Sequence, residues 1–427
     1  MLTSLLALGF MAADARPTAR QLAWHASEYY AFVHFGPTTF TGEEGGHGTE
    51  DPRVFNPSKL DCRQWARTFR AAGMSGVIVT AKHHDGYCLW PSTLSNHTVA
   101  KSPWRNGKGD VLRELSEACR AEGLKMGVYL SPWDRNHPTY GTPAYNDTFV
   151  GMLKEVLTGY GPIFEVWFDG ANGEGPNGKR QVYDWPRFVQ TVRDLQPNAV
   201  IFSDAGPDIR WVGNEDGFAG ETNWGTLRRD EFAPGTPRYK ELTEGHADGT
   251  HWVPAECDVS IRPGWFWRAT EDDKVKSVDR LMEIWYGSVG RGASLLLNVP
   301  PNSDGLISQV DVDRLMAFRQ AREADLAHPL AAKRTTQGTT TRLDLDGTQE
   351  FDLIELREDV ARGQRVRAFE VNALVDGQWQ TLTTGTTINV RRLLKLPRTR
   401  AQAVELKITK SFGLPQVTTA TLYRRPS

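Results

Sequence analysis

The sequence predicts an α/β fold, a (β/α)8-like TIM barrel followed by a C-terminal antiparallel β-sandwich. Strand-like runs alternate with helix-like runs, in at least six units, up to about residue 325. These units carry no glycine-rich dinucleotide fingerprint, which favours a barrel over a doubly wound sheet. After about residue 328 the helical periodicity gives way to short alternating runs, which indicates a separate β-rich part.

Three strand-like runs build the first half of the expected barrel. They are the apolar segments Ala31–Phe35, Gly76–Thr80 and Lys125–Leu130. A helix is expected over Asp61–Ala72, between the first two strands. Asp110 then caps a second helix, whose apolar residues recur at helical spacing before the third strand begins.

The second half of the expected barrel adds further helix–strand units. They are a helix near residues 146–159 before the strand that leads to Asp169, a helix near 185–195 before Ala199–Ser203, and a late helix near 275–288 before Ser294–Val299. Because active sites of such barrels lie beyond the carboxyl ends of the strands, chemistry-bearing side chains are expected to gather there.

The pattern of the C-terminal part, which is about 90 residues long, predicts a small antiparallel β-sandwich. Its alternating runs include Phe351–Leu356 and Arg367–Leu374, and glycines punctuate them. A packing role against the barrel is favoured over sugar binding, because no pattern of exposed aromatics is visible beyond Trp379. We therefore expect a catalytic barrel over residues 16–328 and a sandwich over 329–427.

The N-terminal residues 1–15 are interpreted as a signal-peptide remnant. Residues 2–11 are apolar, and Ala13-Asp14-Ala15 fits a cleavage site, although the usual positive residues are missing. The run is too short to span a membrane. We expect an exported protein, whether periplasmic, extracellular or lysosome-like, with no membrane insertion.

Composition narrows the function. The chain has 50 Lys and Arg against 52 Asp and Glu, without the basic excess that a nucleic-acid partner would favour. Its 14 Trp residues tend to lie next to acids or histidines, which suits sugar ligands, although a tryptophan-rich core would give the same count. The four cysteines show no metal spacing and are expected to be free buried thiols, with a single bridge left open.

Asp169 is the most informative residue. The run Phe164–Phe168 before it predicts a buried strand, and the carboxylate lies where this strand opens into a glycine-rich loop. One interpretation is a cap that ends the strand and starts the loop. The other is a nucleophile that must stay ionised, and the surrounding motifs favour it.

Histidines lie at or beyond the ends of two other strands, His34 at the end of the first and His83-His84 after the second. Adjacent side chains at a strand end usually point to opposite sides, and no H-x-H or H-E-x-x-H pattern is present, so a metal site is disfavoured. Neutral imidazoles that hydrogen-bond sugar hydroxyls are the favoured interpretation. The alternative is that they are structural histidines of the core. The presence of histidines at two different strand ends disfavours this alternative.

A second carboxyl group is needed if the chain hydrolyses glycosides, because one must be ionised and the other protonated. The candidates are Glu215, Glu221 and Glu256, which we place in long loops near tryptophans. An apolar wall would raise the pKa of such a glutamic acid. Spacing does not choose among them. Arg262 either orients a ligand or forms an ordinary salt bridge.

Taken in order, these motifs resemble the α-L-fucosidases of glycoside hydrolase family 29. The resemblance is carried by His34-Phe35-Gly36, by Lys82–Ser92 with its His-His-Asp-Gly block, by Tyr129–Asp134, by Glu165–Ala171 with its Trp-Phe-Asp-Gly block, by Gly213-Asn214-Glu215 and by Ser260–Trp265. It spans the whole expected barrel and extends to a C-terminal β-sandwich.

The resemblance implies a retaining mechanism. Asp169 matches the family nucleophile, which would attack the anomeric carbon and form a fucosyl-enzyme. Glu215 matches the acid/base of the branch that prefers α-1,3/1,4-linked fucose, where a Glu follows Gly-Asn; Asp216 directly after it departs from the pattern. The implied fucose-binding residues are His34, His83, His84 and Tyr129, with Glu50, Trp167 and Arg262 as further contacts.

We therefore expect an exo-acting α-L-fucosidase that uses neither cofactor nor metal and takes a fucosylated oligosaccharide or glycoconjugate. Fucose needs an apolar patch for its methyl group and polar partners for its hydroxyls, which aromatics and histidines supply. Two competing functions stay open at this point. They are a catalytically inactive sugar-binding barrel and a glycosidase for another deoxy or neutral sugar.

Overall fold

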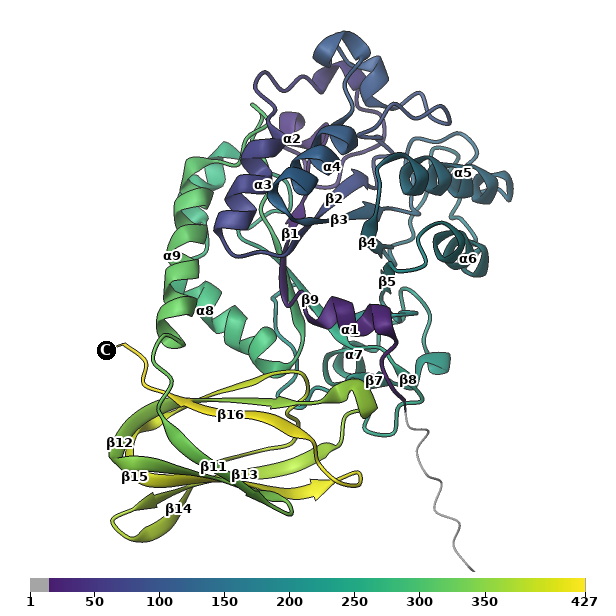
Figure 1. The fold of residues 1–427 in the computed structure, drawn as a ribbon. Helices are drawn as coiled ribbons and strands as arrows, with labels where there is room; N and C mark the ends of the chain where they lie inside the picture. Colours follow the sequence, from purple (N-terminus) through teal and green to yellow (C-terminus); the bar gives the residue numbers. More distant parts are fainter. Residues whose placement is uncertain (1–14, 427) are drawn as a thin grey trace, which may run out of the picture.

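The computed structural model describes residues 15–426, and its N-terminal part is a closed barrel of eight parallel strands (Figure 1). The strands are β1 (Tyr29–Val33), β2 (Gly76–Lys82), β3 (Lys125–Leu130), β4 (Ile163–Trp167), β5 (Val200–Ser203), β6 (Ile209–Trp211), β9 (Ala255–Ser260) and β10 (Ser294–Asn298). Around the ring they follow the order β1-β10-β9-β6-β5-β4-β3-β2, and each neighbouring pair is parallel. The predicted TIM-like barrel is confirmed.

Long helices cover the outside of the barrel. They are α3 (Cys62–Ala71), α4 (Val111–Glu122), α5 (Ala144–Gly159), α6 (Trp185–Leu195), α8 (Val278–Gly287) and α9 (Gln309–Asp325), and the four-residue α2 (Thr38–Thr41) precedes them. Asp61 and Asp110 cap α3 and α4 by accepting hydrogen bonds from first-turn N–H groups, which have no partner within the helix. The apolar face of α3 carries Trp65 and Phe69, both buried against the barrel wall.

One side of the barrel departs from regular strand–helix alternation. Residues 204–208 alone connect β5 to β6, without a helix. Between β6 and β9 the chain forms a two-stranded antiparallel sheet of β7 (Thr226–Leu227) and β8 (His251–Trp252), and the short helix α7 (Tyr239–Glu244) lies between these two strands in the sequence. Our placement of Glu256 in a long loop is wrong, because this residue lies inside β9 with its side chain buried.

Helix α1 (Ala19–His25) closes the amino end of the barrel. Gln21 donates a hydrogen bond to the backbone oxygen of Asp208, just before β6. Trp24 reaches into the interior, where its Nε1 donates to Oε2 of Glu165 at 3.1 Å. The amino end is thereby sealed with aromatic and hydrogen-bonded side chains, and the loops at the carboxyl end are left to form a site.

The C-terminal part is an antiparallel sheet domain, drawn in light green and yellow in Figure 1. Its strands are β11 (Ala332–Gln337), β12 (Thr340–Glu358), β13 (Val366–Val375), β14 (Gln378–Gly385), β15 (Arg392–Ser411) and β16 (Val417–Tyr423). They pair in the order β11-β12-β15-β13-β14, with β16 on β12, and every pair is antiparallel. The predicted C-terminal antiparallel domain is confirmed. Register shifts bend the long strands, and the sheet curls around its own apolar core.

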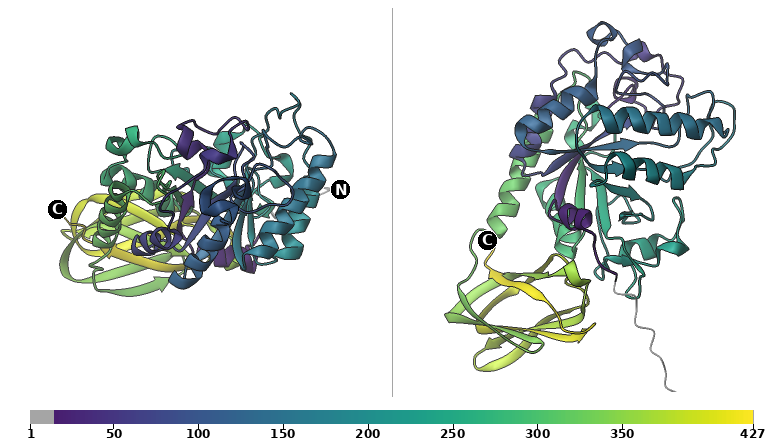
Figure 2. Two further views of the ribbon diagram at one scale, coloured as in Figure 1. Left: turned by 90° about the horizontal axis from the view of Figure 1, so that it is seen from above. Right: turned by 45° about the vertical axis from the view of Figure 1, so that its right-hand side comes forward.

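The sheet domain packs against the flank of the barrel, below α8 in Figure 1 and beside the barrel in both views of Figure 2. Arg391 pairs with Glu28, just before β1, at 2.7 Å. Arg392 donates to the backbone oxygen of Glu221 at 2.6 Å. The two parts are therefore joined by buried or half-buried polar contacts in addition to apolar packing.

Three more expectations concern the whole chain. All four cysteines are free and buried, as expected. Across residues 15–426, none of the helices combines the length and the apolar character needed to cross a membrane. The apolar residues 2–11 lie outside the described part of the chain, so the signal peptide and export stay predictions.

Candidate active site

A cavity of about 230 Å³ lies at the carboxyl ends of the barrel strands. It is lined by Phe32, His34, Glu44, Gly45, His83, His84, Tyr129, Trp167, Asp169, Glu215, Asp258 and Trp265. Seven of the nine predicted site residues are in this set. All of the lining residues belong to the barrel, so the sheet domain adds none of them.

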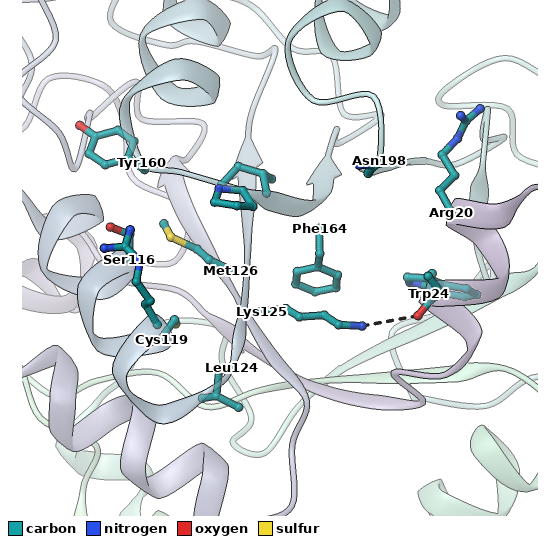
Figure 3. A pocket seen from close by; sticks show the side chains of 14 residues that line it. Arg20, Trp24, Ser116, Cys119, Leu124, Lys125, Met126, Tyr160, Phe164 and Asn198 are labelled. Carbon is teal, nitrogen blue, oxygen red and sulfur yellow. Dashed lines mark hydrogen bonds between the residues drawn. The ribbon is translucent and has the colours of Figure 1, made fainter.

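A second hollow, of about 430 Å³, lies at the opposite end of the barrel (Figure 3). It is bounded by the first residues of β3 and β4, by α1 and by the end of α4, with Met126, Phe164 and Trp24 among its apolar walls. Its lining includes no Asp or Glu. The carboxylates needed for hydrolysis thus lie in the smaller cavity.

Asp169 is fixed at the end of β4 by hydrogen bonds to both of its carboxylate oxygens. Tyr129 donates to Oδ2 at 3.0 Å, and the backbone N–H of Ala171 donates to Oδ1 at 2.7 Å. Burial, and next the charge of Asp169, raise the pKa of Tyr129, so its hydroxyl remains a donor. The result is an oriented carboxylate with one face toward the cavity.

His34 is held as a neutral imidazole at the end of β1. Burial lowers its pKa to about 3. Its Nδ1 lies 2.8 Å from Oδ1 of Asn298, and Nδ2 of the same amide donates to Ser260. Because Asn298 offers an acceptor oxygen, Nδ1 carries the proton, and Nε2 is left as an acceptor for a ligand hydroxyl.

His83 and His84 both line the cavity, so our expectation that they point to opposite sides is wrong. Their ring centroids are 4.2 Å apart. The physical reason is that β2 ends at Lys82, so the strand alternation does not extend to the two histidines. Burial lowers the pKa of His84 to about 4, which leaves it neutral 3.7 Å from Oδ2 of Asp169.

Aromatic rings form the apolar floor of the cavity. Trp167 stacks on Phe202 with centroids 3.9 Å apart, and Tyr129 stacks on its other side at 5.2 Å. The indole N–H of Trp167 donates to Oε1 of Glu256 at 2.8 Å. Glu256 therefore fixes a floor residue from below and does not itself reach the cavity.

Glu215 lies at the mouth of the cavity, on the loop after β6. Its Oε2 accepts a hydrogen bond from the indole of Trp265 at 3.3 Å. Partial desolvation raises the pKa of Glu215, and the charges of Asp169, Glu44 and Asp216 add to this, while the Trp265 indole opposes it. This carboxyl group therefore keeps its proton to higher pH than an ordinary glutamic acid.

The structure separates the three candidate acids that the sequence left open. Glu215 lines the cavity with Asp169. Glu256 is buried one layer below, and Glu221 is exposed beside Arg291 at the junction with the sheet domain. Only Glu215 of the three can meet a ligand that also meets Asp169.

The structure does not bring Arg262 to the cavity. Its side chain is fully buried, and it pairs with Asp311 of α9 at 2.9 Å and with Asp272 at 2.8 Å. The alternative interpretation, an ordinary salt bridge, describes it better than ligand binding. Its role is to tie the segment after β9 to α9.

Glu50 likewise lies outside the cavity lining. Its carboxylate accepts hydrogen bonds from the backbone N–H groups of His47 and Gly48, so it folds its own loop. Glu44, on the same loop, takes the place at the cavity that we expected for Glu50. Oε1 of Glu44 accepts from the backbone of Trp265 at 2.6 Å and Oε2 pairs with Arg268 at 2.7 Å.

One group among residues 15–426 has the geometry to hold a metal ion. A ligand atom from each of Glu50, Asp85 and His97 lies within 4.8 Å of the other two. This group lies beside the loop of Glu50 and contributes nothing to the cavity lining. The absence of a metal from the proposed chemistry stays a prediction.

Sequence reasoning did not select five lining residues: Phe32, Glu44, Gly45, Asp258 and Trp265. Of these five, only Trp265 lies in a motif that carries the family resemblance, Ser260–Trp265. Asp258 lies two residues after Glu256 on β9 and faces the same interior, but it could not be placed from the sequence because this strand has the composition of a loop.

The fold and the site together define a class. A compact cavity on a TIM-like barrel, with an aromatic floor, neutral histidines, an oriented Asp169 and a Glu215 of raised pKa, is typical of a glycoside hydrolase.

Comparison with known proteins identifies the family. The family model for alpha-L-fucosidase matches residues 15–320. The putative alpha-L-fucosidase 1 of Oryza sativa subsp. japonica is 46% identical over 438 residues, which cover 94% of this chain and 83% of the relative. Alpha-L-fucosidase 1 of Arabidopsis thaliana is 39% identical, over 95% of this chain and 87% of the relative. The chain therefore belongs to the alpha-L-fucosidase family, glycoside hydrolase family 29.

Solved structures agree with this assignment. A glycoside hydrolase 29 family member from an unknown rumen bacterium matches with a TM-score of 0.93 and 44% identity, over 97% of this chain and 78% of that chain. A glycoside hydrolase 29 fucosidase from Ruminococcus gnavus, solved in complex with fucose, matches with a TM-score of 0.89 and 29% identity, over 97% and 96% of the two chains.

Proposed function

We propose that this α-L-fucosidase is a retaining, exo-acting enzyme in which Asp169 is the nucleophile and Glu215 is the acid/base. The observation that supports this proposal is that the two carboxyl groups line one cavity and have different surroundings. Asp169 is hydrogen-bonded through both oxygens, while desolvation and neighbouring charges favour the protonated form of Glu215. Glycoside hydrolysis needs two carboxyl groups in one site, and the retaining course is the one that the resemblance to glycoside hydrolase family 29 implies.

In the first step, Oδ of Asp169 attacks the anomeric carbon of the terminal fucose as the glycosidic bond breaks. Glu215 gives its proton to the departing oxygen, so the aglycone leaves as an alcohol. Tyr129 keeps the attacking carboxylate in place throughout. The product of this step is an ester between Asp169 and fucose, with Glu215 ionised.

In the second step, a water molecule attacks the same carbon from the side of Glu215. Glu215 now takes a proton from that water, and the bond to Asp169 breaks. The sugar leaves with its original anomeric configuration, and both carboxyl groups return to their starting states. Because the two displacements use one pair of groups, neither a cofactor nor a metal ion enters the scheme.

We further propose that the natural bonds are α-1,3 or α-1,4 linkages of fucose in glycans. This finer proposal is supported by the Gly213-Asn214-Glu215 sequence, which resembles the branch with that preference. His34, His83 and His84 are proposed to bind the sugar hydroxyls through neutral ring nitrogens. The rings of Phe32 and Trp167 offer an apolar surface for the methyl group.

The experiment compares fucose release from a Lewis-type trisaccharide by the wild type, Asp169→Ala and Glu215→Ala. We expect release by the wild type and a loss of about a thousandfold or more in each variant. Turnover of a simple aryl fucoside without release from the trisaccharide would keep the activity and reject the linkage preference. No turnover of either substrate by folded wild type would favour a sugar-binding barrel.

Two controls address the choice of sugar and the need for a metal. A panel of nitrophenyl glycosides tests whether another deoxy or neutral sugar is preferred over fucose. Exhaustive chelation tests for metal dependence, and we expect full activity to remain. A loss of activity on chelation, restored by a divalent metal, would contradict the metal-free scheme.

A further inference from the structure

The cavity contains two acidic side chains that the proposed reaction does not use, Glu44 and Asp258. Glu44 is already engaged, because its two oxygens bind the backbone of Trp265 and the guanidinium of Arg268. Asp258 has no such cation beside it. A buried acid in a sugar-sized cavity, without a counter-charge, needs a physical explanation.

The position of Asp258 is set by β9. Glu256 and Asp258 are two residues apart on this strand, so both side chains face the barrel interior, Glu256 below and Asp258 above it at the cavity. Asp258 is only 3% exposed. The indole N–H of Trp211 donates to its Oδ1 at 2.9 Å, which leaves Oδ2 for a ligand in the cavity.

The surroundings of Asp258 favour the uncharged form. Burial raises its pKa well above the ordinary value, and the nearby Glu215 and Glu256 carboxyls raise it further. An uncharged carboxylic acid has one O–H donor that a carboxylate lacks. An ionised Asp258 would add a negative charge to the cavity and oppose the loss of the Glu215 proton in the first step. An uncharged Asp258 does not oppose it.

We propose that Asp258 is a further sugar-binding residue, a carboxylic acid whose O–H donates a hydrogen bond to a hydroxyl of the bound sugar. This inference rests on the proposed function of the cavity. It complements His34, whose free Nε2 can only accept a hydrogen bond from the sugar. The cavity thus offers both a donor and an acceptor to the hydroxyls.

The test is a cycle of enzyme and substrate changes. The enzymes are the wild type, Asp258→Ala, Asp258→Leu, which fills the space without a polar group, and Asp258→Asn, which retains one donor and one acceptor. The substrates are nitrophenyl α-L-fucoside and its analogues that lack the 2-, 3- or 4-hydroxyl. For each pair, kcat and KM are measured separately.

We expect Asp258→Ala and Asp258→Leu to lower kcat/KM on the parent substrate about tenfold to a hundredfold, the effect of one lost hydrogen bond in a buried site. With the analogue that lacks the partner hydroxyl, this penalty should vanish. Asp258→Asn should stay within about tenfold of wild type, because its amide N–H replaces the acid O–H.

An equal penalty on the parent and on all three analogues would overturn the proposal, since a merely structural residue would act on every substrate alike. Asp258→Asn as impaired as Asp258→Leu would also overturn it. If Asp258→Ala does not fold, Asp258→Leu carries the cycle. Asp216→Asn changes an exposed acid beside Glu215 and outside the cavity lining; any effect it has through Glu215 should be equal on the parent and on all three analogues.

The outcome of the Asp258 experiment can be interpreted whether or not the proposed mechanism is correct. The cycle needs only measurable turnover of an aryl fucoside by the wild type, whichever residue is the nucleophile. Failure of Asp169→Ala to lose activity would reject the proposed nucleophile and leave the Asp258 cycle interpretable.

Discussion

Glu215 and Glu256 are both glutamic acids that contact a tryptophan indole, yet the structure gives them different tasks. Trp265 donates to Glu215 at the cavity mouth, where a proton can be exchanged with a substrate or with water. Trp167 donates to Glu256 in the closed interior, where no substrate can arrive. Residue type and near neighbours alone therefore do not distinguish the proposed acid catalyst from a structural acid.

The raised pKa of Glu215 predicts a pH profile. Glu215 must be protonated for the first step, so kcat/KM should fall as pH rises through its raised pKa, above the range where an ordinary glutamic acid loses its proton. In Asp216→Asn, a like charge is removed, the pKa of Glu215 falls, and the alkaline limb should move to lower pH. The profile is measured on an aryl fucoside; an alkaline limb that moves upward in Asp216→Asn would be inconsistent with this assignment.

Tyr129→Phe tests how far the reaction depends on a fixed nucleophile. The change removes the hydrogen bond to Oδ2 of Asp169 and keeps the ring that stacks on Trp167. We expect kcat to fall about tenfold to a hundredfold, with KM changed much less. Steady-state kinetics measures both parameters. A variant with an unchanged kcat would show that Ala171 alone suffices to hold the carboxylate.

At the scale of elements, the ends of β1 to β4 were predictable because their apolar runs are long and stop at polar residues. The site residues His34, Tyr129 and Asp169 follow from that pattern. β9 was not predictable, since its inward-facing Glu256 and Asp258 give it the composition of a loop. A barrel interior that binds a sugar must carry such polar residues, and this same property hides the strand in the sequence.

Contacts between distant segments were the other part that sequence could not supply. The buried partner of Arg262 on α9, Asp311, lies 49 residues later in the sequence, and Glu44 contacts Trp265 across 221 residues. Neither spacing carries a local signal. The expected contact of Arg262 with the ligand was therefore wrong, and Glu44 was not predicted to line the cavity.

The loop that carries His84 is anchored by a buried ion pair, which gives a prediction for this element. Lys82 and Asp134 are 3.1 Å apart, with side chains 0% and 2% exposed. Asp134→Ala would leave the ammonium buried without its partner, and we expect a loss of roughly 3–5 kcal/mol in unfolding free energy. The double change Lys82→Met with Asp134→Leu should cost less. Urea denaturation measures both, and equal costs would contradict the argument.

At the scale of the whole molecule, the proposed catalytic cavity and the sheet domain are separate. The cavity is lined by barrel residues alone, and the sheet domain is attached through contacts on the flank. Glu28 pairs there with Arg391 at 2.7 Å and with Arg357 at 3.1 Å. The sheet domain is thus expected to support the fold of the barrel and to leave the chemistry untouched.

Glu28→Gln tests this separation. The change removes the charge that faces the two arginines, and we expect unfolding free energy to fall by about 1–3 kcal/mol. Since no cavity residue is touched, kcat on an aryl fucoside should stay at the wild-type value. Thermal unfolding and steady-state kinetics are measured on the same preparation. A lower kcat with unchanged stability would mean that the sheet domain influences the site.

The proposed mechanism requires that Asp169 forms a covalent bond to fucose. Trapping of this fucosyl-enzyme ester tests the requirement directly. A 2-deoxy-2-fluoro-α-L-fucosyl fluoride carries a good leaving group, and its C2 fluorine slows the hydrolysis of the ester. We expect loss of activity, release of fluoride, a gain of one fluorofucosyl unit in intact mass, and its location on the peptide that contains Asp169. Inactivation with the unit on another residue, or turnover without any adduct together with a product of inverted configuration, would contradict the proposed mechanism.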